Sequence, residues 1–209
     1  MERETDLELM RRSRDGDDDA FAAIVDRYKD PLVNYVTHLV RSRDRAEEIA
    51  QEAFVRLYRN LGSYRDQERV GPYLFRIATN LVVSEARRQK RWALLLPRLR
   101  ASGPTSEAAP EARLLANEIQ QKVWAALDRL PLKYRAPIVL FEIEQWSYEE
   151  IGTALELRSG TVKSRISRAR ALLRTHLAQW WTGGESHVPE RARLVAGTAA
   201  SDGIARLHG

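Results

Sequence analysis

The sequence predicts an all-α protein in which two helical domains are joined by a flexible linker. Apolar residues recur at helical spacing through most of the 209 residues. No segment alternates apolar and polar residues between turn signals, as a half-buried strand would. Between Pro97 and Pro110 the chain reads PRLRASGPTSEAAP, and this content of Pro, Gly and Ser is typical of a linker.

These observations predict helical blocks at about residues 6–92 and 111–182. More finely, they divide the chain into five parts: an N-terminal segment (1–19), a first domain (20–92), the linker (93–112), a second domain (113–182) and a C-terminal tail (183–209). The tail is rich in Gly, Ala, Arg and Ser, which favours disorder. The alternative for the tail is a short regulatory helix over residues 190–196.

The charge balance favours an anionic partner. The chain has 34 Lys and Arg residues against 29 Asp and Glu, which gives a net charge of +5 and suits nucleic acid or a membrane surface. The absence of Cys excludes disulfides and Cys-ligated zinc. No run approaches the roughly 18 apolar residues of a membrane span, and the N-terminus lacks the apolar core of a signal peptide. We therefore expect a cytoplasmic protein without membrane insertion.

The first domain opens with a helix from about Ala20 whose apolar face carries Phe21 and Tyr28. Three acids, residues 17–19, precede it. They are favoured as helix caps over metal ligands, and we expect them to be terminal and mobile. Pro31 predicts either the start of a following helix or a kink.

The next helix spans about residues 44–60 and has an acidic side. Its apolar stripe runs from Ala46 to Leu57 at helical spacing. A solvated helix face and a docking surface for a protein partner are both open interpretations of the opposite side. That side carries Glu47, Glu48, Gln51 and Glu52.

A third helix, about residues 73–91, presents a basic stripe beside its apolar one. Cations at a helix C-terminus complement the dipole, but four within five residues exceed that need. Phosphate and base contacts are therefore predicted for this face. Tyr64 and Tyr73 either stack on unpaired bases or belong to the core. The polar stripe and the cation cluster comprise Arg76, Asn80, Arg87, Arg88, Lys90 and Arg91.

The second domain begins with helices at about 111–129 and 134–144. A helix-turn-helix follows at about residues 147–175. Ser147 and Glu150 have the spacing of a capping box, and Ser159 can cap the second helix. In DNA-binding proteins of this layout the second helix lies in the major groove.

The second helix has an apolar stripe from Val162 to Leu177 and a small polar face centred on Ser164. From residue 160 to 177 it carries five Lys or Arg residues and no acid. Small residues permit close approach to base edges, and flanking cations reach phosphates. The predicted DNA-contacting residues are Lys163, Ser164, Arg165, Ser167, Arg168, Arg170 and Arg174.

Together these segments resemble the extracytoplasmic-function (ECF) sigma factors of bacterial RNA polymerase. RAEEIAQEAFVRLYRN resembles the helix that binds the polymerase, and YLFRIATNLVVSEARRQKR resembles the helix that recognises the minus-ten element. LPLKYRAPIVLFEIEQWSYEEIGTALELRSGTVKSRISRARALL resembles region four, including its GTVKSR signature. The likeness covers residues 20–92, as region two, and 113–178.

The resemblance implies a role in recognition rather than catalysis, with no cofactor or metal. Core RNA polymerase would supply the chemistry and promoter DNA would be the second partner. Whether an anti-sigma factor also binds stays open. By position, the polymerase clamp would be bound by Glu47, Glu48, Gln51 and Glu52. Tyr64 would receive a flipped base, and Asn80 would read the minus-ten element. The minus-thirty-five element would be read by Lys163, Ser164 and Arg168.

The sequence departs from the family pattern at three positions: Tyr73 stands where Trp is commoner, Gly152 where Ala is commoner, and Phe141 where Arg is frequent.

Two other functions remain as alternatives. A stand-alone helix-turn-helix regulator would account for the second domain alone. A metal-dependent nuclease would need clustered carboxylates, and residues 17–19 form the only dense group in the sequence.

Overall fold

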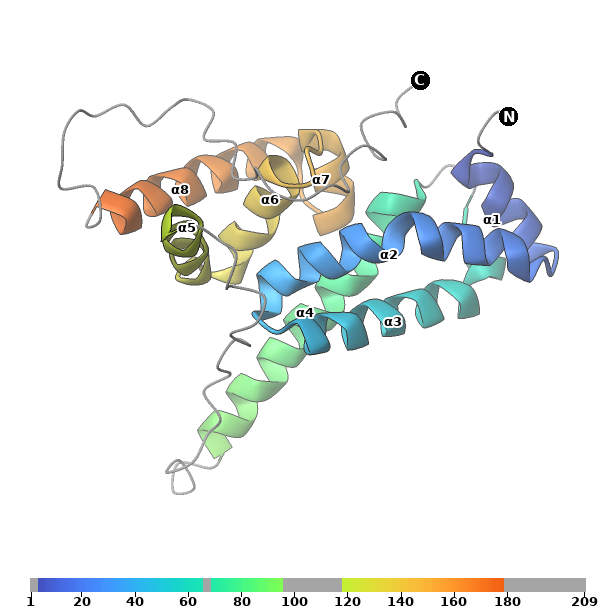
Figure 1. Ribbon diagram of the computed structural model, residues 1–209, viewed down its shortest axis with the longest axis horizontal. Coiled ribbons are helices and arrows are strands. Elements are labelled where there is room, and N and C mark those ends of the chain that lie inside the picture. The colour runs from blue at the N-terminus through green and yellow to red at the C-terminus, as the bar shows by residue number, and fades with distance from the viewer. Residues whose placement is uncertain (1–3, 66–68, 96–117, 179–209) are drawn as a thin grey trace.

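The protein is described here by a computed structural model covering residues 4–65, 69–95 and 118–178. Within these ranges it is helical and contains no strand, which confirms the predicted fold class (Figure 1). The elements are α1 (Asp6–Arg14), α2 (Asp18–Val40), α3 (Arg43–Arg59), the short 3-10 helix η1 (Leu61–Ser63), α4 (Val70–Leu95), α5 (Glu118–Asp128), α6 (Leu132–Glu142), α7 (Tyr148–Leu155) and α8 (Ser159–Ala178).

The N-terminal segment contains a helix that packs into the first block. Thr5 and Glu8 form a capping box at the start of α1, and Leu9 and Met10 are buried. Asp17 accepts a hydrogen bond from the backbone N–H of Ala20 at 3.1 Å, so it caps α2. The capping interpretation is confirmed, whereas the expectation of a mobile terminal segment is wrong. Polar residues dominate α1, and its few buried apolar side chains give a weak periodic signal.

Helix α2 continues through Pro31 instead of restarting there. Proline lacks the backbone N–H that would bond to the carbonyl of Arg27, so one helical bond is absent. Packing outweighs this loss, because Leu32, Tyr35 and Val36 directly after the proline are fully buried. The helix ends at Arg41, whose φ of +67° is left-handed.

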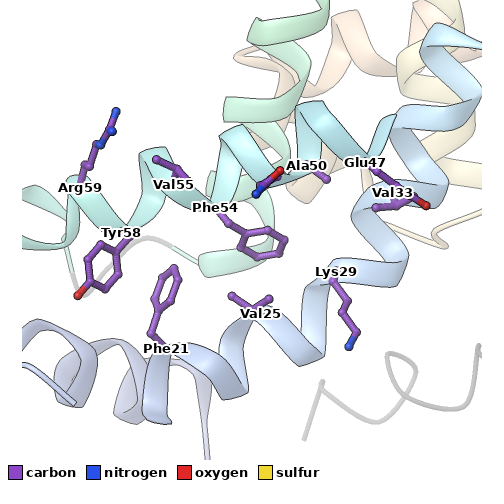
Figure 2. Close-up of a pocket in the computed structure, with 11 residues that line it drawn as sticks. Phe21, Val25, Lys29, Val33, Glu47, Ala50, Phe54, Val55, Tyr58 and Arg59 are labelled. Carbon is purple, nitrogen blue, oxygen red and sulfur yellow. The ribbon is translucent and has the colours of Figure 1, made fainter. Parts of the chain in front are cut away.

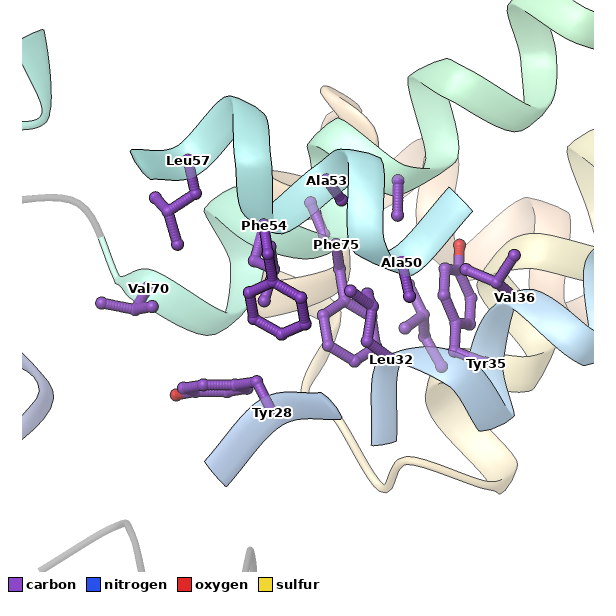
Figure 3. Packing of buried hydrophobic residues seen from close by; sticks show 14 of the residues in the cluster. Tyr28, Leu32, Tyr35, Val36, Ala50, Ala53, Phe54, Leu57, Val70 and Phe75 are labelled. Atoms are coloured by element: carbon purple, nitrogen blue, oxygen red, sulfur yellow. The ribbon is translucent and has the colours of Figure 1, made fainter. Parts of the chain in front are cut away.

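The core of the first block lies where α2, α3 and α4 meet (Figure 3). The ring centres of Tyr35 and Phe75 lie 5.1 Å apart in this core. The hydroxyl of Tyr35 forms a 2.8 Å hydrogen bond with that of Thr79. Since both hydroxyls are buried, this bond satisfies two polar groups that would otherwise destabilise the core.

The second block packs α5, α6 and α8 around a smaller cluster that includes Leu127, Ile138 and Leu173. Arg135 is buried beside this cluster, and its guanidinium donates to backbone carbonyls. The distances are 2.9 Å to Leu130 and 2.9 Å to Asp128. These bonds satisfy carbonyls at the C-terminal end of α5, which have no partner within the helix.

The two blocks are in direct contact. Helix α7 packs against α4, and α6 packs against α2 (Figure 1). The ring of Trp146, in the α6–α7 loop, lies 4.6 Å from that of Phe75 in α4. One continuous buried cluster therefore joins the first block to the helix-turn-helix. Most of the expected linker lies outside the described residues, although α4 extends to Leu95, into its predicted start.

Candidate nucleic-acid interface

The helix-turn-helix consists of α7, a tight turn and α8. The predicted capping box is present: Ser147 Oγ accepts from the N–H of Glu150 at 3.2 Å, and the Glu150 carboxylate accepts from the N–H of Ser147 at 2.9 Å. The turn starts at Glu156, whose φ of +53° is left-handed. The N–H of Leu157 then donates to the carbonyl of Gly152 at 2.8 Å. These contacts fix the direction in which α8 leaves the turn.

Helix α8 separates an apolar face from a polar one, as its sequence predicts. Val162, Ile166, Ala169 and Leu173 are buried. Arg165 is half-buried. The other side is open to solvent, so small hydroxyls and cations are available for contact with a nucleic acid. Its exposed residues are Lys163, Ser164, Ser167, Arg168, Arg170 and Arg174.

Arg170 differs from the other cations of α8 because it is held within the block. Its Nη2 and Nε lie 2.7 and 3.0 Å from the carboxylate of Glu142. Its guanidinium also stands 5.2 Å from the centre of the Phe141 ring, which stacks on Tyr148 at 5.1 Å. Phe141, at a position where Arg is frequent in the resembled family, therefore supports Arg170 here.

The basic stripe of α4 is exposed along its C-terminal half, which projects from the bundle (Figure 1). Sequence reasoning missed Trp92 in this region, whose residue surface is 58% exposed. An aromatic residue directly after a run of cations is the signal that could have found it. The exposed residues of the stripe are Asn80, Arg87, Arg88, Lys90 and Arg91.

The N-terminal part of the same stripe is more enclosed. Tyr64 is only 5% exposed, and its ring meets that of Tyr73 edge-on at 5.6 Å. Tyr73 is half-buried, and the guanidinium of Arg76 stands 4.8 Å from its ring centre. In this arrangement Tyr64 belongs to the core. Its predicted stacking on a base would require the ring to turn outward.

The acidic side of α3 is balanced by arginines of the same helix. Arg43 Nε lies 2.9 Å from Glu47, and Arg56 Nε lies 2.8 Å from Glu52. Arg45 pairs with Glu48. The patch of Glu47, Glu48, Gln51 and Glu52 is therefore exposed or half-exposed and is less negative than its four residues suggest.

A groove beside this patch was not predicted. It lies between α2 and α3 and has a volume of about 420 Å³ (Figure 2). Phe21 and Tyr58 meet edge-on at one end, with ring centres 4.9 Å apart. Glu47 and Gln51 contribute to its rim, so the groove joins an apolar surface to the acidic patch. The apolar lining is Phe21, Val25, Val33, Ala50, Phe54, Val55 and Tyr58.

The described residues contain no group of three or more His, Asp or Glu side chains that could hold a metal ion. Asp17, the first of the three acids considered as metal ligands, is engaged with Ala20 and Arg12. Among these residues no helix is both long and apolar enough to cross a membrane.

Both blocks of the chain match known protein families. Residues 24–92 match the family "Sigma-70 region 2", and residues 120–173 match "Sigma-70, region 4". SigW of Bacillus subtilis, an ECF RNA polymerase sigma factor, is 38% identical over 180 residues, covering 80% of this chain and 94% of SigW. The ECF sigma-E factor of Escherichia coli K12 is 35% identical over 174 residues, covering 79% and 91% of the two chains.

The chain belongs to the ECF RNA polymerase sigma factors. It therefore binds core RNA polymerase and directs promoter-specific transcription initiation, and it is not an enzyme. This decides against both the stand-alone regulator and the nuclease.

Two solved structures share the fold. The sigma factor RpoE of Bartonella quintana, bound to the anti-sigma factor NepR, matches with a TM-score of 0.61 and 23% identity, covering 76% of this chain and 96% of RpoE. CnrH, bound to the cytosolic domain of CnrY, matches with a TM-score of 0.63 and 24% identity, covering 84% and 99%.

Proposed function

We propose that promoter contacts are divided between α8, which reads the upstream minus-thirty-five element, and α4, which contacts the minus-ten element. The observation that carries this assignment is the exposed face of α8, where Ser164 and Ser167 lie among Lys163, Arg168 and Arg174. Small hydroxyl side chains can approach base edges while the cations reach phosphates. On α4, exposed Asn80 is the candidate base reader and Arg87, Arg88 and Lys90 are candidate phosphate contacts.

This assignment divides the chain into a region-two domain at 20–92, a linker at 93–112 and a region-four domain at 113–182. Helix α1, which packs on α2, extends the first domain toward the N-terminus. The predicted tail, residues 183–209, lies outside the described residues. Because the partners are polymerase and chromosomal DNA, we place the protein in the cytoplasm.

The polymerase contact is assigned to α3 and to the groove beside it. Glu47, Glu48, Gln51 and Glu52 supply polar contacts, and the apolar groove supplies area that a partner can bury. A fully solvated face would not need such a groove. RpoE is bound to the anti-sigma factor NepR, and affinity capture with the full chain from its own cells would identify such a partner here.

Arg168→Ala tests the upstream contact. Loss of one phosphate contact weakens binding of a duplex promoter fragment and lowers the slope of log affinity against log salt by about 1. Arg14→Ala on α1, which also removes one exposed cation, is the matched control and leaves the slope unchanged. Equal salt slopes for Arg168→Ala and the unaltered protein, with the fold intact by circular dichroism, would contradict the assignment.

A further inference from the structure

The surface between the two blocks is closed by both apolar and polar contacts. Beyond the tilted ring contact between Trp146 and Phe75, ion pairs cross it at three places. The pairs are Arg69–Glu150 at 3.0 Å, Arg76–Glu156 at 3.7 Å and Arg41–Asp128 at 3.1 Å. The helix-turn-helix is thus held against α4 by α7, while α5 and α6 of the second block pack against α2.

This closed arrangement cannot engage both promoter elements. Elements about 25 base pairs apart are separated by about 85 Å on a duplex that rises about 3.4 Å per base pair. In this structure α7, which leads into α8, packs directly against α4. Arg76, on the proposed minus-ten surface, is paired with Glu156 of the helix-turn-helix. Given the proposed DNA contacts, the blocks have to separate before both are made.

Glu144 is a buried carboxyl group on this surface. It lies in the α6–α7 loop, and the Nδ2 of Asn34 in α2 donates to it at 3.2 Å. The hydroxyl of Tyr35, which is bonded to Thr79, is the other ionisable group that faces it from α2. Among the described residues no Lys or Arg forms an ion pair with Glu144. Burial raises the pKa of Glu144 to about 7.

His38 lies at the other end of the same surface. Its ring stacks on Trp124 of α5, with ring centres 4.2 Å apart and planes inclined by 14°. Arg41, Asp128 and Arg135 form the charged group at this end of α2 and α5. The residue is half-buried, and the loss of solvent around its imidazole lowers the pKa of His38 to about 4.

We propose that the surface between the two blocks is a latch whose closure is governed by two opposed ionisable side chains, Glu144 and His38. Closure favours the neutral form of each residue, because neither gains an oppositely charged partner when the blocks meet. The two residues respond to pH in opposite directions, since ionisation adds charge to Glu144 as pH rises and to His38 as pH falls.

The direction of each effect follows from the open and closed states. In the open state Glu144 returns toward its ordinary pKa of 4.5, so rising pH opens the latch progressively from 4.5 to about 7. His38 returns toward its ordinary pKa of 6.5, so falling pH opens the latch progressively from 6.5 to about 4. Between these ordinary values the two effects offset each other, so the ratio of open to closed molecules in the unaltered chain changes little with pH.

Removing one of the two ionisable groups should reveal the pH response that the other produces. Glu144→Gln keeps the shape and hydrogen-bonding capacity of the neutral acid, and His38→Phe keeps a ring that can stack on Trp124. In His38→Phe the ratio of open to closed molecules rises at least about tenfold from pH 5 to pH 7. In Glu144→Gln it falls at least about tenfold over the same range. The unaltered chain changes by less than about threefold.

The experiment is single-molecule energy transfer on the full chain without DNA or polymerase. Because the chain contains no Cys, Asp30→Cys on α2 and Ala178→Cys on α8 provide two unique dye positions, both at exposed residues. The double variant Glu144→Gln/His38→Phe keeps every other ionisable group of the chain. Its response to pH is therefore the baseline for the two single variants. Opposite slopes for the two single variants and a flat baseline support the latch.

A flat response in both single variants, or slopes of the same sign, would overturn it. Neither outcome depends on where promoter DNA binds, so the latch and the DNA assignment fail separately.

Discussion

The guanidinium Nη1 of Arg76 in α4 lies 3.7 Å from the carboxylate Oε1 of Glu156, the residue that ends α7. One partner belongs to the helix proposed to contact the minus-ten element, and the other to the turn that orients the proposed upstream reader. The helix-turn-helix thus covers part of the stripe of α4 that is proposed to contact DNA.

Glu156→Gln should increase affinity for single-stranded DNA by about two- to fivefold, since an exposed ion pair contributes up to about 1 kcal/mol. The variant removes the carboxylate charge that pairs with Arg76. Fluorescence anisotropy with a labelled oligonucleotide at low salt measures the change. Glu149→Gln, at an exposed glutamate of α7, is the control for the altered net charge. Equal gains for both variants would show that pairing with Arg76 is irrelevant.

Gly152→Ala should destabilise the protein by about 1–3 kcal/mol, because overpacking forces backbone shifts. A Cβ at this glycine would lie 2.7 Å from the carbonyl oxygen of Leu157, well inside contact distance. Urea unfolding measures the difference in free energy. Gly160→Ala is the matched control, since nothing lies within 4 Å of its added Cβ and alanine favours the helix. An unchanged midpoint for Gly152→Ala would contradict the close turn.

Arg135→Lys should reduce stability by about 3 kcal/mol, since each buried carbonyl left without a donor costs about 1–3 kcal/mol. The planar guanidinium serves the carbonyls of Asp128, Leu130 and Leu39 together, and an ammonium cannot match that geometry. Thermal unfolding of Arg135→Lys, compared with the exposed control Arg129→Lys, measures the loss. Equal melting temperatures would mean that the carbonyls find other donors.

Val55→Glu should weaken binding to core RNA polymerase at least tenfold, because it places a charge in the α2–α3 groove where an apolar contact is expected. The site is half-buried, so the fold should tolerate the change. Ala22→Glu, at an exposed position of α2 outside the groove lining, is the control. Co-sedimentation with core polymerase distinguishes them. Full binding by Val55→Glu would remove the groove from the proposed polymerase contact.

Local features were predictable from the sequence because their signals are local. The Ser147–Glu150 capping box and the buried stripe from Val162 to Leu173 depend on spacing along one helix, and both are confirmed. The continuation of α2 through Pro31 was not predictable, since packing on α3 and α4 outweighs the missing hydrogen bond.

The contacts between the two blocks could not be predicted from hydrophobic periodicity. Phe75 and Trp146 are 71 positions apart, and hydrophobicity patterns identify inward faces without naming their partners. The same limit hid the burial of Tyr64, because core packing and base stacking both favour an aromatic residue. The groove between α2 and α3 escaped notice for a related reason, since Phe21 and Val25 have helical spacing whether they face a core or a partner.

In vitro transcription with core RNA polymerase on fragments of the source genome tests the central claim most directly. The protein should direct polymerase to discrete start sites that share an upstream element, and Arg168→Ala should reduce the yield from those sites. The double variant Arg87→Ala/Arg88→Ala should also lose yield if α4 makes the second contact. Start sites identical to those of core polymerase alone would contradict the account.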